Sequence, residues 1–435
     1  MVDPLVDRFS LANGLCVVLA PHARSAVVSM RLQYRVGARD SPPTRPGMTA
    51  LVSQLLKRTA HVADGDYDRL LNEAGGYDAQ SSVVHDRTIF KVTLPSARMA
   101  LPLWLWSEQM GYFGANLDDH LVEQQAKILR NQRVQVVDNT PGGRSYQFVN
   151  AALYPPEHPY RIDAWPSDKM MEGLTAGEIR AFVEPRYGPN NAILVLAGDF
   201  DVRRARELIR TYFEALPSRA VPPRPGGERA ALNTEARLRI AARVELPSVS
   251  IIWSTPSLGA PGDAELDIIG ELLAGDRAGW LRWALVDRLK IASSVSATQT
   301  SRALDSNFII KAFASPGHTS GELVQAIDQV LTELQAKGPG LHDLRAAVVG
   351  YLIHRVFGLE RSSQRAERYA DCEERVIGGY CLKSFMERYG RIDGPALSAT
   401  AARELPLQRR VVVEFVPSAD VPIAGELLRP VSEAR

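Results

Sequence analysis

The chain repeats one order of apolar and polar positions in its two halves. Residues 88–94 form a strand-like run that a proline ends, and a helical apolar spacing follows. Residues 307–313 form a similar run, again ended by a proline and followed by a helical spacing. The two prolines, Pro95 and Pro316, stand 221 residues apart.

A second pair of strand-like runs supports the repeat. Residues 192–196 lead into a small polar turn, and residues 411–415 do the same. These two runs begin 219 residues apart, so the offset between equivalent elements is nearly constant. A constant offset indicates a duplicated domain.

Each half contains paired strands and long helices. Residues 15–20 and 26–34 are apolar runs separated by a short polar turn, as in a hairpin. The amphipathic spacing over residues 119–137 and 344–358 predicts long helices. The expected fold class is therefore α+β, with two homologous sandwich domains that each consist of an antiparallel sheet with helices on one face.

A proline-rich run separates the two halves. Residues 217–227 contain four prolines and two glycines, which exclude a regular helix or a central strand. A chain of 435 residues also exceeds the ~250–300 residues at which a single core stops growing. We expect one domain at residues 1–216, a linker at residues 217–232 and a second domain at residues 233–435.

The composition is that of an ordinary globular protein, and it excludes two classes of partner. Hydrophobic residues make up 45% of the chain and charged residues 23%, with a formal net charge of +1. No basic excess is present, so we expect no nucleic-acid partner. No stretch approaches the ~18–20 apolar residues of a membrane span, so none is expected.

The N-terminus and the cysteines bear on the compartment. Residues 1–8 do not combine a basic region with an apolar stretch, as a signal peptide would, so we expect a cytoplasmic protein. The alternative is a secreted protein whose signal peptide was removed beforehand. The three cysteines, Cys16, Cys372 and Cys381, do not indicate a disulfide framework and are expected to be free thiols.

A series of short motifs in a fixed order spans essentially the whole chain. They are NGLCVV at 13–18, YRVGARD at 34–40, DRTIF at 86–90, DNTPGG at 138–143, HPY at 158–160, PNNA at 189–192 and a C-terminal segment at 285–297. In this order and spacing the sequence resembles the pitrilysin/insulinase-type zinc metallopeptidases, which include mitochondrial processing peptidase. The resemblance implies two α+β domains that form a clamshell around a peptide.

The zinc motif of the family is the part that this chain lacks. In relatives, a helical His-x-x-Glu-His supplies two zinc ligands and a general base, and a glutamate from a later helix completes the site. The matching positions here are Ala50 and Gln54 for the histidines, Ser53 for the base and Gln132 for the later glutamate. Alanine cannot ligate zinc, a neutral amide is a poor ligand, and an unassisted serine is no effective base at neutral pH. We therefore expect no metal and no catalytic residue in this chain.

No other pattern replaces the missing motif. None of the eight histidines lies three or four residues from another, so no helix face carries a histidine pair. No Gly-x-Ser-x-Gly elbow occurs, and Cys16 lies in an apolar run typical of a core strand. The acidic run at residues 118–120 is able to attract a metal but is interpreted as a solvated helix N-terminus.

The second half departs from the family in the same direction. Zinc-less subunits of heterodimeric relatives supply an arginine and a tyrosine, seven residues apart, that hold the substrate carbonyl. Val286 and Ser293 occupy these positions here. The resemblance therefore implies no direct role for this chain in stabilising the transition state.

The substrate strand of the family is retained in outline. Residues 75–82 match the segment whose edge strand pairs with an extended peptide, so Ala79, Gln80 and Ser81 are expected to bind peptide. Such β-augmentation uses backbone groups and tolerates many side chains, so it does not need the metal. The alternative is an edge strand that neighbouring structure merely covers.

These observations favour an inactive homologue that works with others. The resemblance implies the non-catalytic subunit of a heterodimeric peptidase that processes peptides, with zinc only in a homologous catalytic partner. One alternative is a stand-alone pseudoenzyme or a homodimeric peptide-binding scaffold. Another is an active peptidase with an unrecognised site.

Overall fold

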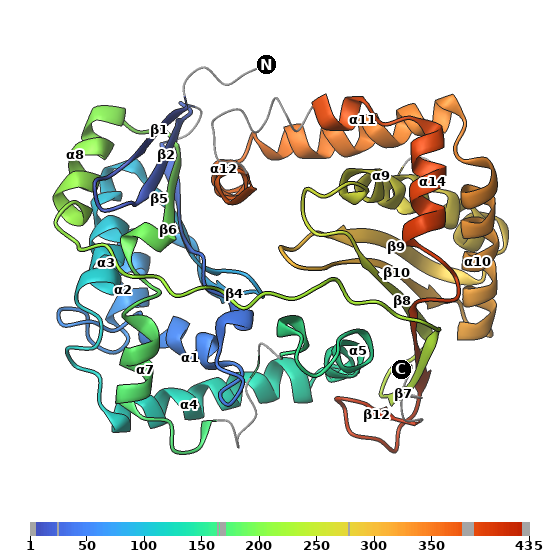
Figure 1. Cartoon of the computed structure of the whole chain (residues 1–435), viewed down its shortest axis with the longest axis horizontal. Coiled ribbons are helices and arrows are strands. Elements are labelled where there is room, and N and C mark those ends of the chain that lie inside the picture. Colours follow the sequence, from blue (N-terminus) through green and yellow to red (C-terminus); the bar gives the residue numbers. More distant parts are fainter. Residues whose placement is uncertain are drawn as a thin grey trace. The chain divides into compact units, whose positions relative to one another are not determined.

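A computed structural model describes residues 6–23, 26–162, 165, 171–276, 279–375 and 387–428 (Figure 1). The chain divides into two compact units, neither of which is continuous in sequence. The first comprises Met1–Asn131, Ile162–Pro225 and Val356–Lys383, and the second comprises Gln132–Arg161, Gly226–Arg355 and Ser384–Arg435. Each unit therefore includes one segment from the opposite half of the sequence.

The first unit is built on a six-stranded sheet in the order β1-β2-β6-β3-β5-β4. Its neighbouring strands are antiparallel except for the parallel pair β2 and β6. The strands are β1 (Asp7–Ser10), β2 (Cys16–Pro21), β3 (Val27–Tyr34), β4 (Tyr77–Val83), β5 (Thr88–Pro95) and β6 (Ala192–Gly198).

The second unit has the order β12-β7-β11-β8-β10-β9 and repeats the arrangement of five strands, while its outer strand β12 comes last in the sequence and β1 comes first. Its one parallel pair, β7 and β11, corresponds to β2 and β6. The strands are β7 (Ala236–Ala242), β8 (Ser248–Thr255), β9 (Ala292–Thr300), β10 (Ser306–Ala314), β11 (Val411–Pro417) and β12 (Glu426–Leu427). The predicted α+β fold with two similar sheets is confirmed.

One predicted pairing is wrong, and the reason also explains the parallel pair. The apolar runs expected to form a hairpin became β2 and β3, but β6 inserts between them. Because β2 and β3 run in opposite directions, a strand between them must be parallel to one of them. Both sheets are accordingly mixed and not purely antiparallel.

One face of each sheet is covered by helices that come from the same half of the sequence as its strands. In the first unit these are α1 (Met48–Leu55), α2 (Asp66–Glu73), α3 (Ala100–Gly111), α4 (Asp119–Arg133), α7 (Ala176–Val183) and α8 (Val202–Phe213). In the second unit they are α9 (Asp263–Ala274), α10 (Ser320–Lys337), α11 (Leu341–Gly358) and α14 (Gly394–Glu404). The main core of each unit lies between these helices and the sheet.

The opposite face of the first sheet is covered by α12 (Ser362–Arg375), which comes from the second half of the sequence. Ala366, Tyr369 and Ala370 of this helix are buried against Val18 and Val195 of the central strands. The expectation of helices on one face only is therefore incomplete. A strand that is apolar on both faces needs a cover on both, because exposed apolar surface destabilises the fold.

The second sheet is covered reciprocally by a segment from the first half. This segment contains η3 (Val134–Asp138), α5 (Ser145–Leu153) and η4 (Pro159–Arg161). Tyr154 and Tyr160 are fully buried against Leu238 and Val413 of the sheet. The linker residues 217–232 form neither helix nor strand.

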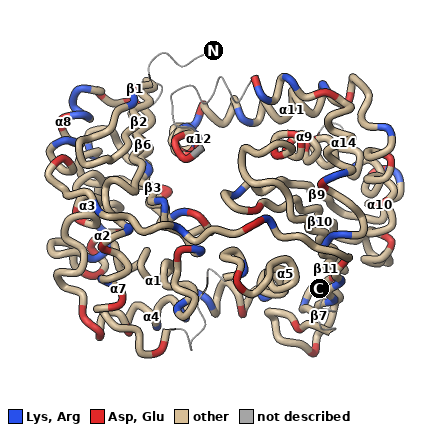
Figure 2. The backbone as a smooth tube through the Cα atoms, viewed as in Figure 1, with Lys and Arg blue, Asp and Glu red and all other residues tan. Residues whose placement is uncertain are grey.

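Charge is spread over both units. Figure 2 shows basic and acidic residues interspersed along each of them, in keeping with the near-zero net charge. An ionic contact of note attaches α12 to its sheet, where Arg87 Nη1 lies 2.7 Å from Asp371 and 2.6 Å from Glu374. All three side chains are largely buried.

We expect Arg87→Met to destabilise the first unit by about 2–3 kcal/mol. Removing the guanidinium leaves two largely buried carboxylates without the cation that contacts them, although Arg31 still attracts both, and breaking a fully buried pair costs ~3–5 kcal/mol. Urea unfolding followed by circular dichroism measures the change. Arg69→Met is the matched control, because Arg69 pairs with Asp66 and Glu73 on an exposed helix surface. Equal effects of the two substitutions would contradict the assignment of α12 as an ionically fixed cover.

His158 generates a pH prediction. Its Nδ1 accepts the Tyr160 backbone N–H at 3.1 Å, its Nε2 donates to the Glu228 carbonyl at 3.0 Å, and its ring stacks on Tyr154 at 4.6 Å. Burial lowers the pKa of His158, so the neutral ring stabilises the fold above the unfolded pKa of ~6.5. That contribution is lost as pH falls below this value.

The difference between the free energies of unfolding of wild type and of His158→Gln should therefore become smaller as the pH is lowered from about 7.5 to about 5.5. Chemical denaturation of both proteins at several pH values tests this. A difference that grows as the solution is acidified would show that the charged imidazole is the stabilising form.

Candidate functional site

Helix α1 carries three of the four positions that the family resemblance assigns to the zinc site. Its apolar residues Leu51 and Val52 are fully buried in the main core of the first unit. Ala50 and Gln54 lie one turn apart on the half-exposed side of the helix. Ser53 is 3% exposed, and its Oγ donates to the Ala50 carbonyl oxygen at 2.8 Å. The hydroxyl is thus engaged by its own helix.

The fourth position, Gln132, lies in the last turn of α4. The division between the two compact units falls between Asn131 and Gln132, so Gln132 belongs to the second unit. Among the described residues, no group of three or more His, Cys, Asp or Glu side chains is arranged to hold a metal ion.

The sequence motifs around α1 act together as a structural clasp. The backbone N–H groups of Ala38 and Arg39 donate to the carbonyls of Val84 and His85 in the β4–β5 turn. Arg39 pairs with Asp86 at 3.2 Å across the same contact. The motif at 34–40 therefore joins the motif at 86–90 and fixes the hairpin that contains β4.

Strand β4 is the last strand of its sheet, as the sequence predicted for the substrate strand. No strand of the described residues pairs with its outer edge. The Val84 N–H donates to the Arg87 backbone carbonyl at 3.0 Å. Because these groups alternate in direction along an extended strand, the N–H and C=O groups of Ser81 and Val83 face the open edge. Helix α1 packs against this strand.

A β-bulge interrupts the start of β4. Tyr77 pairs with Thr93 and Gln80 pairs with Lys91, so Asp78 and Ala79 oppose a single residue of β5. Asp78 has a φ of +53°, and its carboxylate holds Lys91 at 2.9 Å. Of the three predicted peptide-binding residues, Ala79 therefore lies in the bulge, while Gln80 and Ser81 lie in the regular part of the strand.

The positions where zinc-less relatives have an arginine and a tyrosine lie on either side of one turn. Val286 is half-buried in the segment η6 (Arg282–Arg288), and it packs against the core of the second unit. Ser293 is exposed near the start of edge strand β9, where its Oγ donates to the Phe313 carbonyl at 3.4 Å. Neither side chain offers a charge to a substrate carbonyl.

The cysteines differ from the expectation of three free thiols. Cys16 is free, and burial, with Glu373 nearby, raises the pKa of its thiol to about 11, so it stays protonated and is not a nucleophile. Cys372 is disulfide-bonded, which corrects the prediction for that residue. Cys381 lies outside the described residues. Because a disulfide depends on distance in the fold, spacing in a chain with three cysteines does not reveal it.

Comparison with known proteins places this geometry in a family. Residues 173–348 match the family described as "Peptidase M16 inactive domain". The zinc protease PqqE of Helicobacter pylori is 26% identical over 383 residues, which cover 85% of this chain and 83% of that protein. Over most of its length this chain is similar to peptidases of the M16, or pitrilysin/insulinase-type, family.

Two crystal structures share the fold of this M16 homologue. One, of a protease from Helicobacter pylori, superposes with a TM-score of 0.85 at 24% identity and covers 95% of this chain and 100% of the other. The other, of a peptidase M16 inactive domain from Pseudomonas fluorescens, has a TM-score of 0.81 at 17% identity and covers 95% and 98%. The matched family segment is thus of the inactive type. None of the helices described is both long and apolar enough to span a bilayer.

We expect the double variant Ala50→His/Gln54→His to bind zinc at least about tenfold more tightly than wild type. Two histidines one helical turn apart reach a common zinc ion, and both positions are half-exposed on one side of α1. Calorimetric titration with zinc chloride measures the affinity, and the single variant Ala50→His is the control. A double variant that keeps its circular dichroism spectrum but binds zinc no better than the single one would show that α1 does not present these positions together.

Proposed function

We propose that this chain is a catalytically inactive M16 homologue that serves as the non-catalytic subunit of a heterodimeric zinc peptidase that processes peptides. The observation that carries the proposal is that helix α1 lacks zinc-binding side chains while the neighbouring strand β4 has an open edge. Helix α1 has Ala50, Ser53 and Gln54 at the zinc and base positions, while β4 keeps unpaired backbone groups at the sheet edge. Chemistry is lost from the side chains, and peptide binding is retained in the backbone.

The edge strand supports binding of an extended peptide. The outward N–H and C=O groups of Ser81 and Val83 need partners, which water or a peptide strand supplies. Ala79, Gln80 and Ser81 are the proposed contact residues. Because backbone hydrogen bonds carry the interaction, many side chains are accepted in the peptide.

The catalytic zinc is proposed to lie in a homologous partner subunit. Zinc needs three protein ligands and an open position for water, and Ala50, Gln54 and Gln132 do not provide them. A zinc site within this chain would therefore require several substitutions. A partner subunit that carries the intact motif provides the zinc site with no substitution.

A stand-alone pseudoenzyme or homodimeric peptide-binding scaffold is the alternative, and it uses the same edge strand without a catalytic partner. The two readings differ in whether a second, zinc-bearing chain is needed for peptide cleavage. The cytoplasmic location stays a prediction, and the disulfide-bonded Cys372 favours an oxidising compartment instead, because cytosolic thiols are kept reduced.

The purified chain should not hydrolyse peptides, whereas its mixture with a zinc-bearing M16 subunit from the same genome should. Ser81→Pro should lower the activity of the mixture at least about tenfold, because proline removes the outward N–H of β4. Ser81→Ala is the matched control and should leave it unchanged. A fluorescent peptide library followed with time provides the readout.

Two results would overturn parts of this proposal. Hydrolysis by the purified chain alone, abolished by a chelator, would show an active enzyme. A mixture no more active than the catalytic subunit alone, together with a homodimer in light scattering and retained peptide binding, would favour the scaffold.

A further inference from the structure

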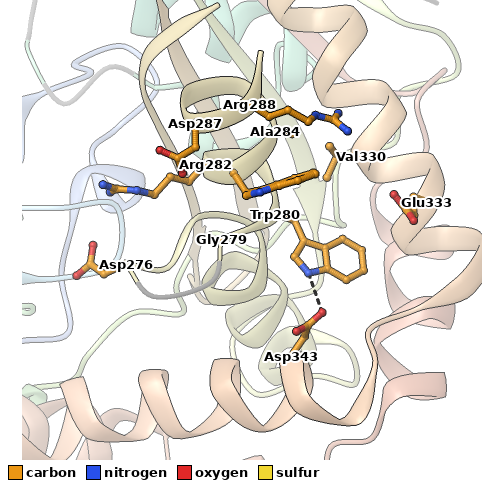
Figure 3. Close-up of a pocket in the computed structure, with 11 residues that line it drawn as sticks. Asp276, Gly279, Trp280, Arg282, Ala284, Asp287, Arg288, Val330, Glu333 and Asp343 are labelled. Atoms are coloured by element: carbon orange, nitrogen blue, oxygen red, sulfur yellow. Dashed lines mark hydrogen bonds between the residues drawn. The ribbon is translucent and has the colours of Figure 1, made fainter. Parts of the chain in front are cut away.

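The second unit contains a cavity, whose lining Figure 3 shows, and Trp283 is one of the residues that line it. Trp283 is 57% exposed, so its indole is available to a partner. The cavity measures about 560 Å³, which falls in the ~300–1,000 Å³ range of ligand sites. Its walls are formed by residues of η6, α10 and α11 and by residues that precede η6, Trp280 among them.

Two indoles give the cavity aromatic walls. Trp280 Nε1 donates to Asp343 Oδ2 at 3.2 Å, and Figure 3 shows this bond linking the ring to α11. This hydrogen bond uses the edge of the Trp280 indole and fixes its orientation, so the two ring faces are not involved in it. The guanidinium of Arg288 lies 4.5 Å from the centre of the Trp283 ring, a cation–π contact. One face of this indole thus already attracts a guanidinium of the chain itself.

The charge of the walls is net negative. Four carboxylates and two guanidiniums line the cavity. In the part of the chain that the structure describes, Asp287 takes part in no ion pair, and Glu333 pairs only with Lys337, at 3.5 Å. A carboxylate such as Asp287 without an ion-pair partner attracts a cation from outside, and the concave surface concentrates the field.

We propose that this cavity binds an arginine side chain of a peptide or protein partner. A guanidinium is planar, so it stacks on an indole and at the same time donates two parallel hydrogen bonds to a carboxylate. An ammonium is more strongly hydrated and does neither as well. The site goes beyond the proposed peptidase role, since it involves no residue of α1 or β4.

Calorimetric titration with two blocked tripeptides tests the site. The first is acetyl-Ala-Arg-Ala-amide, and the second carries citrulline, a neutral side chain of nearly the same shape, in place of arginine. The arginine peptide should bind at least about fivefold more tightly than the citrulline peptide. Raising the salt concentration from 50 to 300 mM should weaken the arginine peptide only, because salt screens the carboxylates.

Variants of the cavity complete the test. Trp283→Leu and Asp287→Asn should each weaken binding of the arginine peptide at least about fivefold. Glu214→Gln, an exposed carboxylate of the first unit, is the matched control and should not change binding. Should Trp283→Leu alter the circular dichroism spectrum, the exposed Asp287→Asn decides the question. Equal binding of the two peptides, or unchanged binding to Asp287→Asn, overturns the proposal.

Discussion

The structure depends on the need to bury both faces of two mixed sheets. The central strands β2 and β6 carry apolar side chains on both faces, and helices from their own half of the sequence cover only one of them. The other face is closed by α12, which arrives from the second half. The second sheet is closed by α5 and η4, which arrive from the first half. Hydrophobic burial therefore couples the two halves of the sequence.

This exchange determines how stability is distributed. A fragment cut at the linker would lack one cover for its sheet, and the strands would expose an apolar surface to water. The covering segments are held by polar contacts as well as by burial. Arg87 pairs with two carboxylates of α12, and His158 bonds through both ring nitrogens beside Tyr154. Short motifs that resemble functional signatures thus have structural roles here.

The difference between buried and half-exposed positions explains how α1 keeps its place in the core without the residues that the family uses to bind zinc. The buried side of α1 fills the core beside β4, whereas the zinc positions Ala50 and Gln54 lie on its half-exposed side. Substitutions on that side remove possible ligands without opening a cavity in the core. Strand β4 depends on backbone groups, so its open edge is insensitive to most side-chain changes. The proposed loss of the zinc site and the proposed peptide-binding edge are therefore compatible in one domain.

The sequence by itself determined the repeat and the α+β class, because periodicity and the constant offset between similar runs can be read from a single chain. The place of β4 at a sheet edge was implied by the family resemblance. The sequence also determined the residue types at the zinc positions. The tertiary structure alone decided that β6 separates the predicted hairpin strands β2 and β3, that α12 and the α5 segment exchange between units, and that Cys372 is disulfide-bonded. It alone gathered Trp280, Trp283 and the carboxylates around one cavity. The strand order and the exchanged covers join residues that are distant in sequence, and no local pattern records which distant surface a strand or helix will bury.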